Sequence, residues 1–89
     1  MTELQGKVLV VDDNRTNRLK LSISLKQQGH TAELAEDGHQ AMERLRAESF
    51  DVVLLDILMP GMDGFQVLEQ MKADPALRDV PVIVISALD

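Results

Sequence analysis

The sequence contains no cysteine, no strongly basic stretch and no long apolar run. Without cysteine there can be no disulfide bond and no thiolate metal site. The net charge of −6 argues against a nucleic-acid-binding surface, which requires a basic patch. No apolar run approaches the roughly 20 residues of a membrane helix, and no signal-peptide pattern begins the chain. These absences predict a cytoplasmic protein that binds neither nucleic acid nor membranes.

The composition is typical of one small globular domain. The chain has 89 residues, of which 45% are hydrophobic and 27% are charged. Such values are common in soluble folded proteins. A domain of this size buries a smaller share of its surface than an average domain, so we expect a narrow margin of stability.

The apolar residues gather in four short segments that predict β-strands. A run without polar alternation is typical of strands buried on both faces, as in parallel sheets. The second of the four segments is the weakest. The segments are Lys7–Val11, Thr31–Ala35, Val52–Leu55 ending at Asp56, and Val80–Ile85 ending at Ser86.

The stretches between these segments are long enough for crossover helices. We predict helices over Arg15–Gln28, about Gly38–Ala47 and about Gly64–Ala73. Their expected N-caps are Asn14, Asp37 and Asp63. The core-facing residues of the second helix are predicted to be Ala41, Met42 and Leu45, and those of the third to be Phe65, Val67, Leu68 and Met71.

The first of these helices has an ambiguous pattern. Its apolar residues alternate strictly, which is the period of a strand; they are Leu19, Leu21, Ile23 and Leu25. The segment is nevertheless longer than a typical strand, and Gly29 suits the residue just past a helix end. We therefore predict a helix with two apolar stripes on nearly opposite sides.

Polar residues follow three of the predicted strands. Strands that alternate with helices predict an α/β doubly wound parallel sheet with right-handed crossovers. In such sheets ligands bind at the carboxyl ends of the strands. Asp12 and Asp13 end the first strand, Asp56 ends the third and Ser86 ends the fourth. We expect these four residues to meet at one edge of the sheet.

The chemistry of this group predicts a cation site with a nucleophile. Crowded carboxylates repel one another unless a cation lies among them. Oxygen ligands without His or Cys are typical of Mg²⁺ or Mn²⁺ sites. A carboxylate can also accept a phosphoryl group, and a nearby metal ion offsets the charge of that group. The alternative is that these acids are merely solvated loop residues, which is less favoured for a doublet, a third acid and a serine together.

Three motifs resemble the receiver domains of two-component response regulators, the CheY-like superfamily. Residues 10–14 (VVDDN) are similar to the acidic-pair motif of that family. Residues 51–64 (DVVLLDILMPGMDG) look like its phosphoacceptor strand and loop, and residues 82–87 (VIVISA) like its switch-residue strand. The resemblance covers nearly the whole chain. It implies a flavodoxin-like fold with strand order 2-1-3-4 and a signalling phosphoacceptor rather than an enzyme.

The resemblance also implies a role for each matching residue. Asp56 would be the phosphoacceptor, and Ser86 would be the switch hydroxyl. Asp13, Asp56 and the backbone carbonyl of Leu58 would bind Mg²⁺ or Mn²⁺ directly, and Asp12 would act mainly through a water molecule. The phosphoryl donor would be a histidine kinase or a histidine phosphotransfer protein.

The resemblance places the first helix on the surface that faces this partner. Arg15, Arg18 and Leu19 would then contribute to partner specificity.

The chain departs from the family pattern after the fourth predicted strand. The fifth strand, the last two helices and the characteristic Lys of the family have no counterpart, so residues 1–89 are expected to form a receiver domain that is incomplete at its C-terminus. The missing Lys bears on signalling more than on metal binding. Residues 82–85 would form an exposed apolar edge strand, which predicts self-association.

Two other functions are compatible with parts of the sequence. An aspartyl phosphatase on a related sheet usually has a DxD motif, but the residue two positions after Asp12 is Asn14. A receiver-like module without phosphotransfer activity, acting in protein interaction or dimerisation, is the second alternative. Nucleotide binding is disfavoured, because the chain has no GxGxxG or GK[ST] loop.

Overall fold

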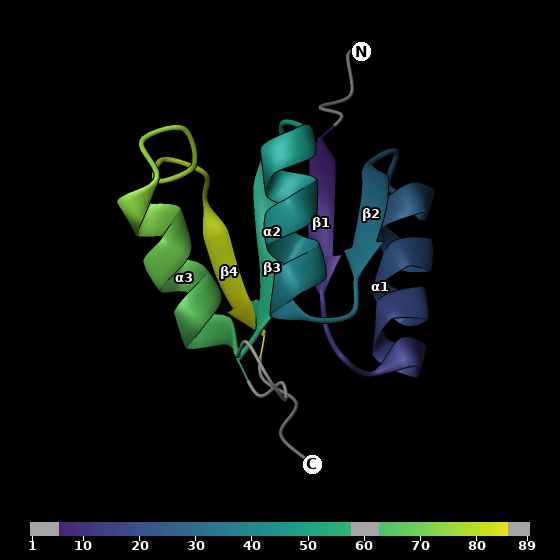
Figure 1. The fold of residues 1–89 in the computed structure, drawn as a ribbon. Coiled ribbons are helices and arrows are strands. Elements are labelled where there is room, and N and C mark those ends of the chain that lie inside the picture. The colour runs from purple at the N-terminus through teal and green to yellow at the C-terminus, as the bar shows by residue number, and fades with distance from the viewer. Residues whose placement is uncertain (1–5, 58–62, 86–89) are drawn as a thin grey trace.

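The computed structural model describes residues 6–57 and 63–85, which form alternating strands and helices (Figure 1). In chain order the elements are β1 (Lys7–Val11), α1 (Arg15–Gln27), β2 (Thr31–Ala35), α2 (Gly38–Ala47), β3 (Val52–Asp56), α3 (Gly64–Ala73) and β4 (Val82–Ile85). Among the described helices, none has the length and apolar character needed to cross a membrane.

The strands form one parallel sheet of four strands in the order β2-β1-β3-β4. β1 lies in the middle, where Val11 pairs with Ala35 on one side and with Leu55 on the other. β4 extends the sheet beyond β3, and Ile85 pairs with Asp56. The predicted doubly wound parallel sheet and its strand order are therefore confirmed.

Polar caps begin the helices at the predicted residues. The side chains of Asn14 and Asp37 accept hydrogen bonds from the backbone N–H three residues on, at 3.0 and 2.8 Å. Asp63 and Gln66 form a capping box at the start of α3. Gly29 follows α1 with a φ of +90°, which favours glycine. The ambiguous segment is thus a helix, one residue shorter than predicted.

The core lies between the sheet and the helices α2 and α3. Alternate residues of β1 and β3 face these helices, whereas their neighbours Val8 and Val10 point to the other face, where α1 covers β1 and β2. Parallel pairing holds the carboxyl ends of β1 and β3 side by side, and helices cover both faces of the sheet. The buried residues of the α2–α3 side include Leu9, Val11, Ala41, Met42, Leu45, Val53, Leu55, Val67 and Met71.

The prediction that Phe65 faces the core is wrong. Its side chain is 59% exposed. The buried stripe of α3 recurs every three or four residues, which is the period of one helix face. Phe65 lies outside that stripe, because it is one residue, or about 100°, away from the buried Gly64. The stripe consists of Gly64, Val67 and Met71, with Leu68 partly buried.

The fourth strand begins two residues later than predicted, at Val82. The backbone N–H of Val80 donates to the carbonyl of Leu77 at 3.0 Å and so closes a turn. Pro81 then contributes only a carbonyl, which accepts a hydrogen bond from the N–H of Val53 at 2.9 Å. The apolar character of residue 80 therefore reflects packing against the core and not strand pairing.

Contacts of Lys7 fix the amino end of β1. Its ammonium group pairs with the carboxylate of Glu48 and lies 5.3 Å from the centre of the Phe50 ring. The hydrogen bond from Lys7 lowers the pKa of the Glu48 carboxyl below its usual value. The backbone N–H of Lys7 also donates to Asp51 at 2.7 Å. These contacts lie at the edge of the sheet opposite to the predicted site.

β4 presents apolar side chains on both faces of the sheet. In the part of the chain that the structure describes, β4 pairs only with β3. Ile83 is 54% exposed and Val84 is 45% exposed, and strand alternation points them to opposite faces. Val84 lines a groove of about 340 Å³ together with Leu68 and Met71 of α3. Within residues 6–57 and 63–85, β4 is therefore the expected exposed apolar edge strand.

Candidate functional site

The register of β1 and β3 brings two acidic residues together. Val11 pairs with Leu55, so the residues that follow, Asp12 and Asp56, reach the carboxyl edge of the sheet at the same level. From β1 the chain crosses over to β2 on one side, whereas β3 lies on the other side. The two acids therefore lie at the switch point of the sheet, where ligands of doubly wound folds bind.

Asp13 completes a group of three carboxylates. One ligand oxygen from each of Asp12, Asp13 and Asp56 can be chosen so that all three atoms lie within 4.8 Å of one another. Asp12 is 3% exposed and Asp56 is 2% exposed, whereas Asp13 is open to solvent. The group therefore has two buried oxygen donors and one that faces the solvent.

Backbone hydrogen bonds hold Asp12 in place. Its N–H donates to the carbonyl of Ala35 in β2 at 3.1 Å, and its Oδ1 accepts from the N–H of Asn14 at 2.8 Å. Its own carbonyl accepts from Arg18 Nη1 at 2.7 Å. These three hydrogen bonds fix the backbone at Asp12, where the turn after β1 begins.

The start of α3 packs directly on the backbone of Asp56. The N–H of Gly64 donates to the carbonyl of Ile57 at 3.1 Å. A Cβ at position 64 would lie only 2.5 Å from Ile57 Cα and 2.7 Å from the carbonyl oxygen of Asp56. Glycine is therefore required here for a close approach of backbones.

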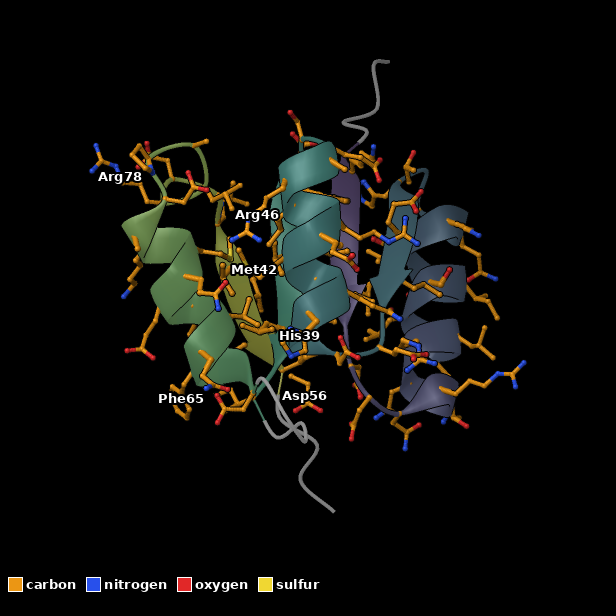
Figure 2. All side chains as sticks on the ribbon, viewed as in Figure 1. His39, Met42, Arg46, Asp56, Phe65 and Arg78 are labelled. Atoms are coloured by element: carbon orange, nitrogen blue, oxygen red, sulfur yellow. The ribbon has the colours of Figure 1, made fainter. Side chains whose placement is uncertain are left out.

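Figure 2 shows Asp56 and His39 toward the same end of the molecule, away from Arg78. His39 lies in the first turn of α2 and is exposed. It is not part of the group of ligand atoms found in the described residues. The donor set there is thus three carboxylates.

Two of the predicted site residues lie outside the residues that the structure describes. They are Ser86, the expected switch hydroxyl, and Leu58, whose backbone carbonyl was expected to bind the metal. The structure brings together the other three, Asp12, Asp13 and Asp56.

The family model described as the response regulator receiver domain matches residues 8–89. The chain belongs to this family. Among curated relatives, the receiver is 40% identical to the protein PilH of Pseudomonas aeruginosa over 84 residues, which are 94% of this chain and 69% of PilH. It is also 40% identical to the response regulator PleD of Caulobacter vibrioides over 86 residues, 97% of this chain but 19% of PleD. The receiver thus spans about a fifth of PleD.

Solved structures share the receiver fold. The N-terminal domain of a response regulator receiver protein from Methanoculleus marisnigri has a TM-score of 0.90 and 40% identity, over 93% of this chain and 68% of that one. The response regulator TrrA from Thermotoga maritima, solved in complex with Mg²⁺ and BeF, has a TM-score of 0.85 and 31% identity, over 93% of this chain and 70% of that one.

The structure gives two residues a place that the sequence did not indicate. Arg18 was expected on the partner-facing surface of α1 with Arg15 and Leu19, yet its side chain is only 14% exposed and its guanidinium contacts Asp12. Gly64 begins α3 as predicted, but the sequence did not indicate that its backbone packs directly on that of Asp56. Both residues lie near recognisable motifs, the acidic pair and the Asp-Gly dipeptide. The direction of the Arg18 side chain and the close approach of the Gly64 backbone are visible only in the structure.

Proposed function

We propose that this receiver domain accepts a phosphoryl group on Asp56 in a reaction that needs Mg²⁺ or Mn²⁺. The observation that carries the proposal is the convergence of three carboxylates at the switch point of the sheet, with ligand oxygens within 4.8 Å of one another. The donor would be a phosphohistidine of a histidine kinase or of a histidine phosphotransfer protein.

The donor set fits a hard divalent cation. Three carboxylates without His or Cys are typical of Mg²⁺ and Mn²⁺ sites. Asp13 and Asp56 would hold the ion directly, and Asp12 would act mainly through a water molecule. The carbonyl of Leu58 is proposed as a third direct ligand. When bound, the cation would offset the negative charge on the phosphoryl group.

The proposed step is a nucleophilic substitution at phosphorus. A carboxylate oxygen of Asp56 forms the new P–O bond, while the P–N bond of the donor phosphohistidine breaks and the imidazole leaves with the electron pair. Burial of Asp56 in the carboxyl end of β3 fixes the nucleophile and keeps bulk water from most of its surface. The hydroxyl of Ser86 would bind the attached phosphoryl group.

The geometry gives less support to an aspartyl phosphatase. Such an enzyme would need an acid or base two residues after Asp12. That residue is Asn14, whose side-chain oxygen accepts the N–H of Asn17 as the N-cap of α1. Asn14 therefore caps the helix and supplies no acid or base, so we expect no turnover of a small phosphomonoester.

The proposal predicts a covalent adduct. The chain would be incubated with acetyl phosphate and Mg²⁺, and its intact mass recorded with and without the metal. We expect one added phosphoryl group that requires Mg²⁺, that maps to Asp56 and that is absent in Asp56→Asn. Asp51→Asn is a control, because Asp51 is an acid at the opposite edge of the sheet. An adduct on the Asp56→Asn variant, or no adduct on a folded wild type that binds Mg²⁺, would contradict the proposal.

A second candidate function is interaction with another copy of the chain through β4. The observation in its favour is the exposed apolar edge, with Ile83 54% and Val84 45% exposed. Among the described residues, one side of β4 pairs with no other strand, so it offers both backbone groups and apolar side chains to a strand of another copy.

Sedimentation velocity over a range of concentrations tests this self-association. We expect the wild type to form dimers or larger species, and Ile83→Lys to remain monomeric because a charged side chain opposes edge pairing. Ile23→Lys is the matched control, since Ile23 is an isoleucine of α1 that is 58% exposed. A compact monomeric wild type at high concentration would exclude the interaction.

A further inference from the structure

Arg18 joins three segments around the acidic site. It lies in the second turn of α1, and its Nη1 donates to the carbonyl of Asp12 at 2.7 Å. Its Nη2 lies 3.9 Å from Glu36 Oε2 at the start of the loop before α2. The side chain is 14% exposed, which is low for an arginine. The guanidinium is thus held between the turn after β1 and the loop after β2.

The contact with Asp12 fixes one particular peptide group. The carbonyl of Asp12 and the N–H of Asp13 belong to the same planar unit, so a bond to the carbonyl restrains both. Two further polar groups of Asp12 are engaged elsewhere, its N–H with the carbonyl of Ala35 and its Oδ1 with the N–H of Asn14. The direction in which the exposed Asp13 leaves this peptide therefore depends on Arg18.

We propose that Arg18 is a positioning residue that orients the Asp12–Asp13 peptide, so that the Asp13 carboxylate faces Asp56 in readiness for a divalent cation. This role rests on the proposed cation site. Arg18 itself does not touch the cation; it acts through the backbone before Asp13. A prearranged ligand loses less conformational freedom on binding, so this restraint strengthens binding.

The charge of Arg18 acts in the opposite direction. A guanidinium near a cation site repels the cation, although Glu36 beside it offsets part of this repulsion. Replacing Arg18 with a neutral residue would remove both the restraint on the peptide and the charge repulsion, so the two effects could not be separated. Arg18→Lys keeps the charge but removes the planar fork that reaches Asp12 and Glu36 together, so it isolates the positional effect.

The test compares Mn²⁺ and Mg²⁺ affinities, measured by isothermal titration calorimetry, for the wild type and Arg18→Lys. We expect Arg18→Lys to bind about tenfold more weakly, at the lower end of the range seen when outer contacts of metal ligands are lost. In the metal-free protein, we also expect ¹⁵N relaxation to show a more mobile Asp13 amide. Arg46→Lys is the matched control, because Arg46 is an exposed residue in the last turn of α2.

A double-mutant cycle with Asp13→Asn decides whether Arg18 acts through Asp13. If it does, Arg18→Lys weakens cation binding in the wild-type background and has little further effect in Asp13→Asn. Equal losses in both backgrounds, or an Arg18→Lys affinity equal to that of Arg46→Lys, would overturn the positioning role while leaving the cation site intact. A folded wild type that binds neither cation would overturn the site itself, and with it this role.

Discussion

Gly64→Ala is expected to destabilise the fold by about 2–3 kcal/mol, near the upper end for an added methyl group in a packed interior. The added Cβ would lie 2.5 Å from Ile57 Cα, 2.7 Å from the carbonyl oxygen of Asp56 and 3.2 Å from its carbonyl carbon. All three atoms belong to the backbone, so no flexible side chain can move away. Either α3 or the end of β3 must shift.

The same shift is expected to weaken the acidic site. Asp56 is the last residue of β3, and its oxygen ligands must stay close to those of Asp12 and Asp13. A displacement of about 1 Å at this point is enough to disturb a prearranged site. We therefore expect a loss of Mn²⁺ affinity in addition to the loss of stability.

Urea unfolding and Mn²⁺ titration of two alanine variants measure both effects. Gly6→Ala is the matched control, because a Cβ at position 6 would meet its nearest neighbour, His30 Nδ1, at an ordinary 3.6 Å. We expect Gly6→Ala to change stability and affinity little. A Gly64→Ala variant as stable as Gly6→Ala would show that α3 can move away from Asp56 at low cost.

Local sequence signals predicted most of the fold, because capping residues mark where the helices begin and apolar runs mark the strands. The side chains of Asn14, Asp37 and Asp63 cap the helices as predicted. Hydrophobic runs predicted the strands, and the acids that follow them predicted the edge at which they meet. The parallel register then places Asp12 beside Asp56 without further information.

Features that depend on the distance between elements could not be predicted in this way. Phe65 belongs to an apolar segment, but the close approach of Gly64 to Asp56 sets the rotation of α3 and turns Phe65 outward. The direction of Arg18 depends on the position of the Asp12 carbonyl, which no local pattern encodes. Val80 is apolar because it packs on the core, although a turn and not a strand contains it.

Asp13→Asn is expected to be more stable than the wild type without metal and less stable than the wild type in excess Mg²⁺. In the metal-free protein, the variant should be more stable than the wild type by up to about 1 kcal/mol, because one of three mutually repelling carboxylates is removed. Solvent around the exposed Asp13 keeps this gain small. The same substitution removes a charged ligand, so cation affinity should fall by about tenfold or more.

Excess Mg²⁺ should then favour the wild type. A ligand that binds only the folded state stabilises it by RT ln(1 + [L]/Kd), so the protein with the lower Kd gains more. Thermal unfolding with and without Mg²⁺ measures this reversal. Asp79→Asn is the control, because Asp79 is an exposed acid in the turn before β4 and the charge change is the same. If both variants respond alike to Mg²⁺, the effect comes from net charge, and Asp13 is not a ligand. If only Asp13→Asn loses the stabilisation by Mg²⁺, Asp13 is a ligand. The repulsion that destabilises the metal-free protein then arises because the three carboxylates are arranged to bind a cation.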